Sequence, residues 1–141
     1  MSQENVEIVK EMNAALNGGD IDDALTHYAP DAEVRDLANG PDQPTLVRGT
    51  DQIREIWALW TAAFDELHAD VEEFLDAGSA VICASHWIGR GRTSGMSIDG
   101  RQFDVFELRD GNIIRAILGC KSKAEALEAA SLLEQDAHAD S

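Results

Sequence analysis

Residues 101–119, RQFDVFELRDGNIIRAILG, have the composition of two β-strands joined by a tight turn at Asp110-Gly111. Asp-Gly between two β-rich runs is a strong hairpin signal, because both turn positions favour a left-handed backbone. Alternation along the first arm gives two faces: Gln102, Asp104, Phe106 and Leu108 on one, and Phe103, Val105, Glu107 and Arg109 on the other. Asp104 thus shares a face with apolar residues, which makes it a candidate functional group.

Three stretches before this hairpin also have the composition of strands, at residues 32–37, 68–76 and 80–92. The last two of these and the hairpin predict a four-stranded antiparallel meander, because short turns separate them. Residues 39–49 and 93–100 are punctuated by Gly, Pro and Asp, so we expect a loop and a turn-rich connection there.

Alternation also assigns faces to these earlier strands. Asp36 shares a face with Ala32 and Val34, so it is a second carboxylate among apolar neighbours. In the strand over 80–92 we expect one set to point inward and the other outward: Ile82, Ala84, His86, Ile88 and Arg90 inward, and Val81, Cys83, Ser85 and Trp87 outward. This assignment places His86 on the same side of the sheet as Asp104.

Apolar residues recur at helical spacing in four segments, which predict helices over 3–17, 20–28, 50–67 and 122–134. The third of these carries a stripe that includes two Trp and one Phe: Ile53, Ile56, Trp57, Trp60 and Phe64. Core packing accounts for part of this stripe. The alternative for one Trp is a place beside a cavity, because Trp often keeps its N–H near a polar or wet space.

The order of these elements predicts an α+β fold over residues 1–141, as one domain with a loose tail from about residue 136. A curved antiparallel sheet packed against three N-terminal helices, with a C-terminal helix added, forms a cone. Two acids and a His pointing inward indicate that side chains do not fill its interior. The predicted lining of this cavity is Met12, Tyr28, Trp57, Trp60, His86, Asp104, Phe106 and Leu118.

The charge balance narrows the classes of partner. The chain has 27 Asp+Glu against 11 Lys+Arg, a formal net charge of −16, which would repel the phosphates of nucleic acids and anionic membranes. No run approaches membrane-spanning length and the first residues carry no apolar signal core, so we expect a cytoplasmic protein.

Motifs for metals and cofactors are absent from the sequence. The histidines show no H-x-H or HExxH spacing, and Cys83 and Cys120 belong to no CxxC pair, so we expect two buried thiols and no metal site. No glycine-rich phosphate loop follows a predicted strand and no G-x-S-x-G occurs, so we also expect no cofactor.

Three segments together resemble the nuclear-transport-factor-2-like (cystatin-like) superfamily: ALNGGDIDDALTHYAPDAEVRD (15–36), RGTDQIREIW (48–57) and FDVFELRDGNIIRAILG (103–119). Within it, the chain is most similar to the SnoaL-like polyketide cyclases and the ketosteroid isomerases, from about Val6 to Ala130. The resemblance implies the cone fold, and homodimers are common in this superfamily. It says little about activity, because the fold hosts isomerases, cyclases, dehydratases and non-catalytic binding domains.

The ketosteroid isomerase pattern also implies roles for particular residues. Asp36 falls where that family has its general base, and Asp104 falls where it has a second, protonated acid. Met12 stands where the family has its oxyanion Tyr, and Trp57 stands where it has a supporting Tyr. Met cannot donate a hydrogen bond and Trp donates only through its indole N–H, so the chain departs from the steroid isomerase pattern at both positions.

Two functions from different classes follow from these residues. In the first, the protein is a cofactor-free isomerase, cyclase or dehydratase acting on a small apolar carbonyl compound, with Asp36 as the base and Asp104 or His86 as the stabilising donor. In the second, the pocket binds a small apolar ligand, or serves in assembly, without catalysis. Structural roles are the alternative for the acids: Asp36 would cap the loop near Asn39 or pair with Arg48, and Asp104 would pair with His86 or Arg90.

The outer face of the sheet predicts a homodimer. Five residues assigned to this face are too apolar for a surface in water: Val81, Cys83, Trp87, Phe103 and Val105.

Overall fold

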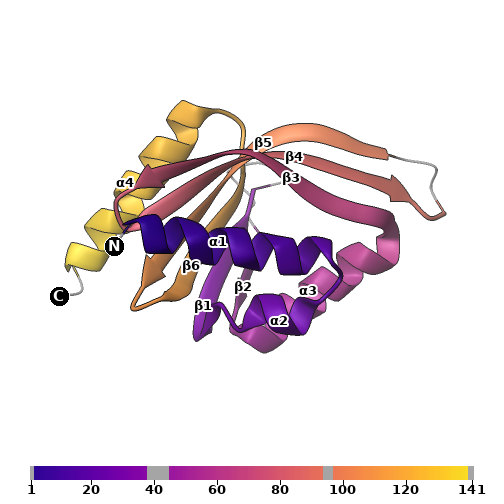
Figure 1. Ribbon diagram of the computed structural model, residues 1–141, viewed down its shortest axis with the longest axis horizontal. Coiled ribbons are helices and arrows are strands. Elements are labelled where there is room, and N and C mark those ends of the chain that lie inside the picture. Colours follow the sequence, from indigo (N-terminus) through magenta and orange to yellow (C-terminus); the bar gives the residue numbers. More distant parts are fainter. Residues whose placement is uncertain (1, 38–44, 94–96, 140–141) are drawn as a thin grey trace.

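The computed structural model describes residues 2–37, 45–93 and 97–139 (Figure 1). Its elements are α1 (Ser2–Asn17), α2 (Ile21–Leu25), β1 (Tyr28–Asp36), β2 (Thr45–Arg48), α3 (Thr50–Ala63), β3 (Phe64–Ala77), β4 (Ala80–Gly91), β5 (Ser97–Arg109), β6 (Asn112–Cys120) and α4 (Lys123–Ala139). All four predicted helices and the predicted hairpin are present. The hairpin turn has Asp110 and Gly111 both at positive φ, as Asp-Gly turns require.

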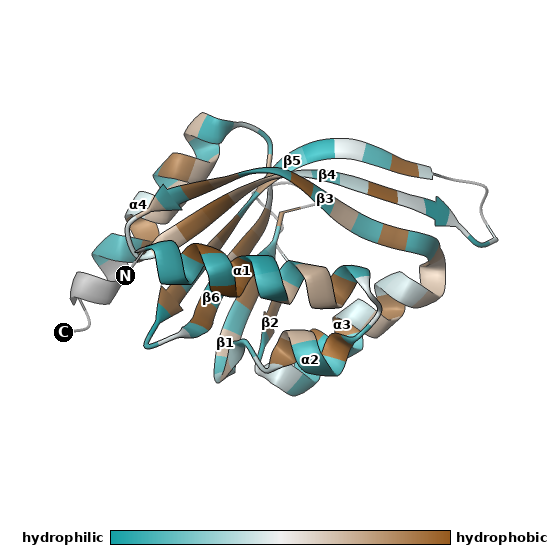
Figure 2. Cartoon of the chain, in the orientation of Figure 1, coloured by the Kyte–Doolittle hydropathy of each residue, from teal (hydrophilic) through white to brown (hydrophobic). Residues whose placement is uncertain are grey.

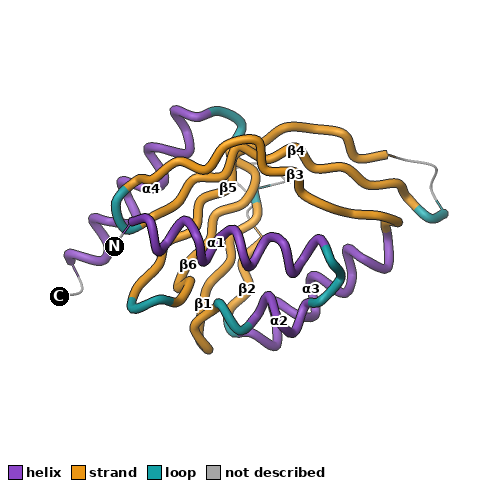
Figure 3. Tube along the Cα trace, in the orientation of Figure 1, coloured by secondary structure: helices purple, strands orange, loops and turns teal. Residues whose placement is uncertain are grey.

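The strands form one sheet in the order β2-β1-β6-β5-β4-β3. The predicted antiparallel meander is confirmed for β3 to β6, while β1 pairs with β6 in parallel and with β2 antiparallel. Helices α1, α2 and α3 lie on one side of this curved sheet and α4 lies on the other (Figures 1 and 3). The architecture is therefore the predicted α+β cone, with α4 closing its outer side.

Several element boundaries differ from those predicted. Helix α2 ends at Leu25, because the hydroxyl of Thr26 bonds back to the carbonyl of Asp23 and β1 begins at Tyr28. Helix α3 ends at Ala63, and the sequence from Phe64 onward continues as β3.

Two segments predicted as irregular contribute strands. Within 39–49, β2 pairs with the end of β1, and residues 38–44 lie outside the described part of the chain. Within 93–100, Ser97–Gly100 extends β5 along β4, so no turn forms at Asp99-Gly100. Helix α4 reaches Ala139, beyond the predicted end at residue 134, and the loose tail from about residue 136 stays a prediction.

Buried apolar residues form two layers, one on each side of the sheet, and Figure 2 marks the hydrophobic residues along the strands between α1 and α4. The inner layer joins α1–α3 to the sheet and includes Phe106 and Leu108. The outer layer joins the sheet to α4 and includes Val105, with Phe103 packed against it. The two faces predicted for the first arm of the hairpin are therefore confirmed.

The faces predicted for β4 are reversed. Cys83 lies opposite Asp104 on β5, and Val81 lies opposite Phe106. Residues directly opposite in an antiparallel pair point to the same side of the sheet. The set that points inward is therefore Val81, Cys83, Ser85 and Trp87, and the set that points outward includes Ile82, Ala84 and His86.

This reversal removes the surface on which the homodimer was predicted. Val81, Cys83 and Trp87 point into the interior, while Phe103 and Val105 lie beneath α4. The homodimer itself stays a prediction.

A buried ion pair ties three elements together on the outer side. Arg115 Nε of β6 lies 2.6 Å from Glu107 Oε1 of β5, and the same guanidinium donates to the carbonyl of Leu133 in α4 at 3.1 Å. The Glu107 side chain is 2% exposed, so its charge depends on this partner for compensation.

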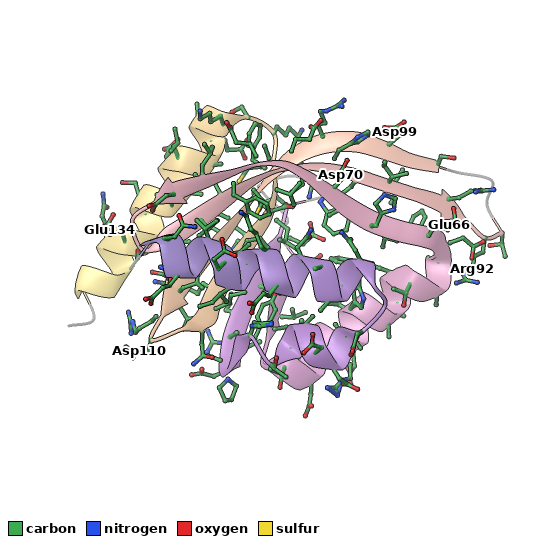
Figure 4. The ribbon with its side chains drawn as sticks, viewed as in Figure 1. Glu66, Asp70, Arg92, Asp99, Asp110 and Glu134 are labelled. Carbon is green, nitrogen blue, oxygen red and sulfur yellow. The ribbon has the colours of Figure 1, made fainter. Side chains whose placement is uncertain are left out.

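We expect Glu107→Ala to lower the free energy of unfolding by about 3 kcal/mol, because it removes a fully buried carboxylate and breaks its ion pair with Arg115. Urea denaturation followed by circular dichroism measures this change. The control is Glu134→Ala on the exposed part of α4 (Figure 4), which should change stability by less than about 0.5 kcal/mol. Equal losses in both variants would contradict the structural role of the pair.

Candidate functional site

A cavity of about 50 Å³ lies between helices α1–α3 and the inner face of the sheet. We call it the inner cavity. Every strand except β2 contributes to its wall, and most of the wall is apolar or aromatic. Among its described lining residues, Asp104 is the one acid, and there is no Lys, Arg or His.

Asp104 is held in place by donors from three strands. Trp87 Nε1 of β4 donates to Oδ2 at 3.0 Å, and Gln102 Nε2 of β5 donates to Oδ1 at 2.8 Å. The backbone N–H of Gly119 in β6 donates to Oδ1 at 3.0 Å, and the Ser85 side chain adds a further hydrogen bond. With an exposure of 2%, the carboxyl group exchanges its water for these four protein partners.

The pKa of Asp104 reflects two opposed effects. Burial raises it above the usual value of 3.8, and the hydrogen bonds from its partners lower it in part. A protonated carboxyl group would need an acceptor for its own O–H, whereas an indole N–H and a peptide N–H can only donate. Trp87 and Gly119 therefore fit the ionised carboxylate, while the Ser85 hydroxyl can accept as well as donate.

Two groups near Asp104 are held neutral. Burial, followed by the nearby charge of Asp104, raises the pKa of Tyr28 and of Cys83. The Tyr28 hydroxyl lies 3.7 Å from the sulfur of Met12, its weak acceptor. Tyr28 thus stays a neutral phenol at the cavity wall.

All three tryptophans of the chain line the inner cavity. Trp57 and Trp60 come from the inner stripe of α3, and Trp87 comes from β4. The ring of Trp57 meets that of Trp60 at a centroid distance of 5.7 Å and an angle of 74°, and meets that of Trp87 at 6.2 Å and 61°. These edge-to-face contacts hold the rings at steep angles to one another.

A second cavity, of about 270 Å³, adjoins the first across Trp60, Trp87 and Leu118. We call it the outer cavity, a name that does not refer to the outer face of the sheet beneath α4. Trp60, Trp87 and Leu118 line both cavities and so form the partition between them. Asp36, at the end of β1, lines the outer cavity and not the inner one. Gln102 also lines the outer cavity, while its amide reaches Asp104.

The structure brings together most of the residues predicted for the pocket. The inner cavity contains Met12, Tyr28, Trp57, Trp60, Asp104, Phe106 and Leu118. The two predicted acids do not share one cavity, because Asp36 lies beyond the partition.

The prediction that His86 lies in the pocket is wrong. His86 lies opposite Arg101 on the outer face, and its Nε2 pairs with the carboxylate of Asp99. Figure 4 shows Asp99 on β5, on the side of the sheet away from α1. The alternative role for Asp104 was an ion pair with His86 or Arg90. His86 pairs with Asp99 and Arg90 pairs with Glu66, so neither residue is a partner of Asp104.

Asp36 was also expected to pair with Arg48 or to cap the loop near Asn39. Arg48 Nη2 lies 2.7 Å from Glu33 Oε2, which is the ion pair that it forms instead. Asn39 lies outside the described residues.

Sequence reasoning did not place any of the four residues that hold Asp104 in the site. Trp87 and Ser85 were assigned to the wrong face of β4. Gly119 contributes only its backbone N–H, at a φ of 89°, and a backbone donor leaves no side-chain signal. Gln102 was placed on the face of Asp104 but not in the site. Its position two residues from Asp104 on one strand was the available signal.

The described residues contain no group of three or more His, Cys, Asp or Glu placed to hold a metal ion. Across the same residues, no helix combines the length and apolarity needed to cross a membrane. Both cysteines are buried and unpaired, as predicted.

A family model for the SnoaL-like domain matches residues 9–116, so the chain belongs to the SnoaL-like family. A protein with a ketosteroid isomerase-like fold from Catenulispora acidiphila, solved in complex with trimethylamine, is 21% identical, with a TM-score of 0.71 over 89% of this chain and 92% of that one. An NTF2-like protein from Burkholderia thailandensis is 25% identical, with a TM-score of 0.71 over 79% and 86%. TerC, co-crystallised with polyporic acid, is 19% identical, with a TM-score of 0.70 over 89% and 98%. No curated protein matches the chain.

The raised pKa of Asp104 predicts the pH dependence of stability. The folded state binds this proton more tightly than the unfolded state, so the contribution of Asp104 to stability is present below about pH 4 and is lost as pH rises through its folded pKa. Asp104→Asn does not titrate. The free energy of unfolding of the parent minus that of Asp104→Asn should therefore fall from pH 4 upward and level off once Asp104 has ionised, in urea titrations at a series of pH values.

Asp99→Asn provides a control of opposite sign. The hydrogen bond from His86 lowers the pKa of Asp99, so its contribution is present above its unfolded pKa and is lost as pH falls through the folded one. The corresponding difference for Asp99 should therefore rise with pH over the acid range. A difference for Asp104 that also rises with pH would show that its hydrogen bonds outweigh its burial.

Proposed function

We propose that this SnoaL-like domain binds a small molecule in the inner cavity and does not transform it. The observation that carries the proposal is the bonding of Asp104, whose two carboxyl oxygens already accept hydrogen bonds from Trp87, Gln102 and Gly119. An acid bonded in this way is a fixed acceptor and not a donor waiting for a developing oxyanion. The second acid, Asp36, lies in the other cavity.

Two structural relatives support a small ligand. The Catenulispora protein was solved with trimethylamine, and TerC was co-crystallised with polyporic acid. In this chain, a cavity of about 50 Å³ has room for a molecule of only a few heavy atoms. A larger ligand would extend into the outer cavity by displacing Trp60 or Trp87 from the partition.

The three tryptophans make occupancy directly measurable. Because every Trp of the chain lines the inner cavity, we expect a bound ligand to change the intrinsic fluorescence in a saturable way. A panel of small amines, alcohols, ketones and carboxylic acids, titrated at constant ionic strength, tests the proposal.

Val71→Phe and Leu59→Phe form a matched pair for this titration. Val71 lines the inner cavity, so the larger ring should fill it and abolish the ligand response. Leu59 is 65% exposed on α3, so the same kind of enlargement there should leave the response unchanged. No saturable response to any compound, or one that survives in Val71→Phe, would contradict binding in the inner cavity.

A second function, proton transfer on a small carbonyl compound, is favoured by the place of Asp36. Its carboxyl group lines the outer cavity beside Trp60, Trp87 and Leu118, where it could remove a proton from a substrate that spans the partition. Asp104 would have to act as the stabilising donor, which its N–H partners oppose. This function therefore ranks below simple binding.

Asp36→Asn separates these two functions if a substrate is found. The substitution keeps the size of the side chain and removes the base, so it should abolish turnover and leave ligand affinity nearly unchanged. Steady-state kinetics and a fluorescence titration of the same variant give both quantities. Turnover as fast as that of the parent would exclude Asp36 as the base.

A further inference from the structure

We infer that the inner cavity selects a small methylated ammonium ion over a neutral molecule of the same size, an inference that rests on the binding function proposed above. Four features of the inner cavity carry it: the charge on the wall, the angles of the indole rings, the free volume and the few free hydrogen-bond acceptors.

When Asp104 is ionised, the inner cavity carries a negative charge that no cationic side chain among its described lining residues balances. Asp104 is its one acid, and the groups that bond to it are neutral: an indole, an amide, a peptide N–H and a hydroxyl. No Lys, Arg or His is present among the described residues of the wall. A buried carboxylate with this environment attracts a cation, and the formal net charge of −16 adds a favourable long-range field.

The aromatic rings complete a site for a cation. Trp57 lies nearly perpendicular to Trp60, at 74°, and steeply inclined to Trp87, at 61°. The three indole rings are therefore not stacked in parallel, and each of them lines the inner cavity. Tyr28, held as a neutral phenol, adds a fourth ring to the wall. Aromatic rings, and indoles most strongly, attract cations, and the attraction grows when the site is dry.

The volume limits the size of the cation. The free volume of about 50 Å³ admits a molecule of only a few heavy atoms. Trimethylammonium and tetramethylammonium, with four and five heavy atoms, are of this size.

Hydrogen bonding separates methylated from primary ammonium ions. Oδ1 of Asp104 already accepts from Gln102 and Gly119, and Oδ2 accepts from Trp87. A primary ammonium ion has three N–H groups to satisfy and finds few acceptors left on this wall. A tertiary ion has one such group and a quaternary ion has none, so burial costs them less.

Isothermal titration calorimetry at constant ionic strength, combined with tryptophan fluorescence, tests the selectivity. The probes are tetramethylammonium, methylammonium and tert-butanol, which is neutral and close to tetramethylammonium in shape and size. We expect tetramethylammonium to bind at least about ten-fold more tightly than either of the other two.

Variants locate this binding. Asp104→Asn should weaken tetramethylammonium binding about ten-fold or more, and Trp60→Leu should weaken it while leaving the carboxylate in place. If circular dichroism shows that Asp104→Asn is unfolded, Trp60→Leu still tests whether tetramethylammonium binds in the inner cavity. Asp99→Asn removes the same charge from the far side of the sheet and should leave the affinity unchanged.

Tert-butanol that binds as tightly as tetramethylammonium would overturn the cation inference and leave the binding function standing. Equal weakening by Asp99→Asn and Asp104→Asn would overturn it too, by showing a general effect of net charge. If none of these probes binds and the wider panel also gives no response, the binding function itself fails.

Discussion

The burial of one carboxylate sets the arrangement of the interior. Asp104 can lie in an apolar cone only because β4, β5 and β6 each bring a donor to it. These three bonds require β4 to present Trp87 inward and β6 to expose a peptide N–H at Gly119. The positive φ of Gly119 is a backbone geometry that glycine adopts at little cost. The bonding of Asp104 therefore depends on three features: the register of strand pairing, the face that β4 turns inward and the position of the Trp87 ring.

Much of the fold was readable from local signals. The Asp110-Gly111 turn, the alternation in β5 and the apolar stripe of α3 each reflect a short-range constraint, and each appears in the structure. Asp20 accepts a hydrogen bond from the N–H of Asp23, as an N-cap should. The place of Asp104 in the interior was also predicted, because a carboxylate between Gln102 and Phe106 on one face needs a special environment.

The errors in the facing of β4 share one physical cause, which is that α4 covers the outer face of the sheet. Alternation of residues along a strand separates its two faces, but it identifies the inner face only when the other face is exposed to water. Both faces of β4 are apolar here, since Ile82 packs toward α4 while Val81 and Cys83 pack toward α1. The choice depends on the register with β5, a long-range pairing that residues 80–92 do not encode by themselves. His86 was misplaced for this reason.

The partition between the two cavities has a kinetic consequence. Trp87 cannot swing out of the partition without withdrawing a hydrogen bond from a buried carboxylate, whereas Trp60 bonds to no such group in the described structure. A ligand that crosses the partition from the outer cavity therefore passes at the lowest cost on the Trp60 side, through a motion of the end of α3. Entry then depends on how often this side chain moves aside. Beyond a certain ligand concentration the observed association rate should stop rising, and a ligand once inside should leave slowly, even where its affinity is modest.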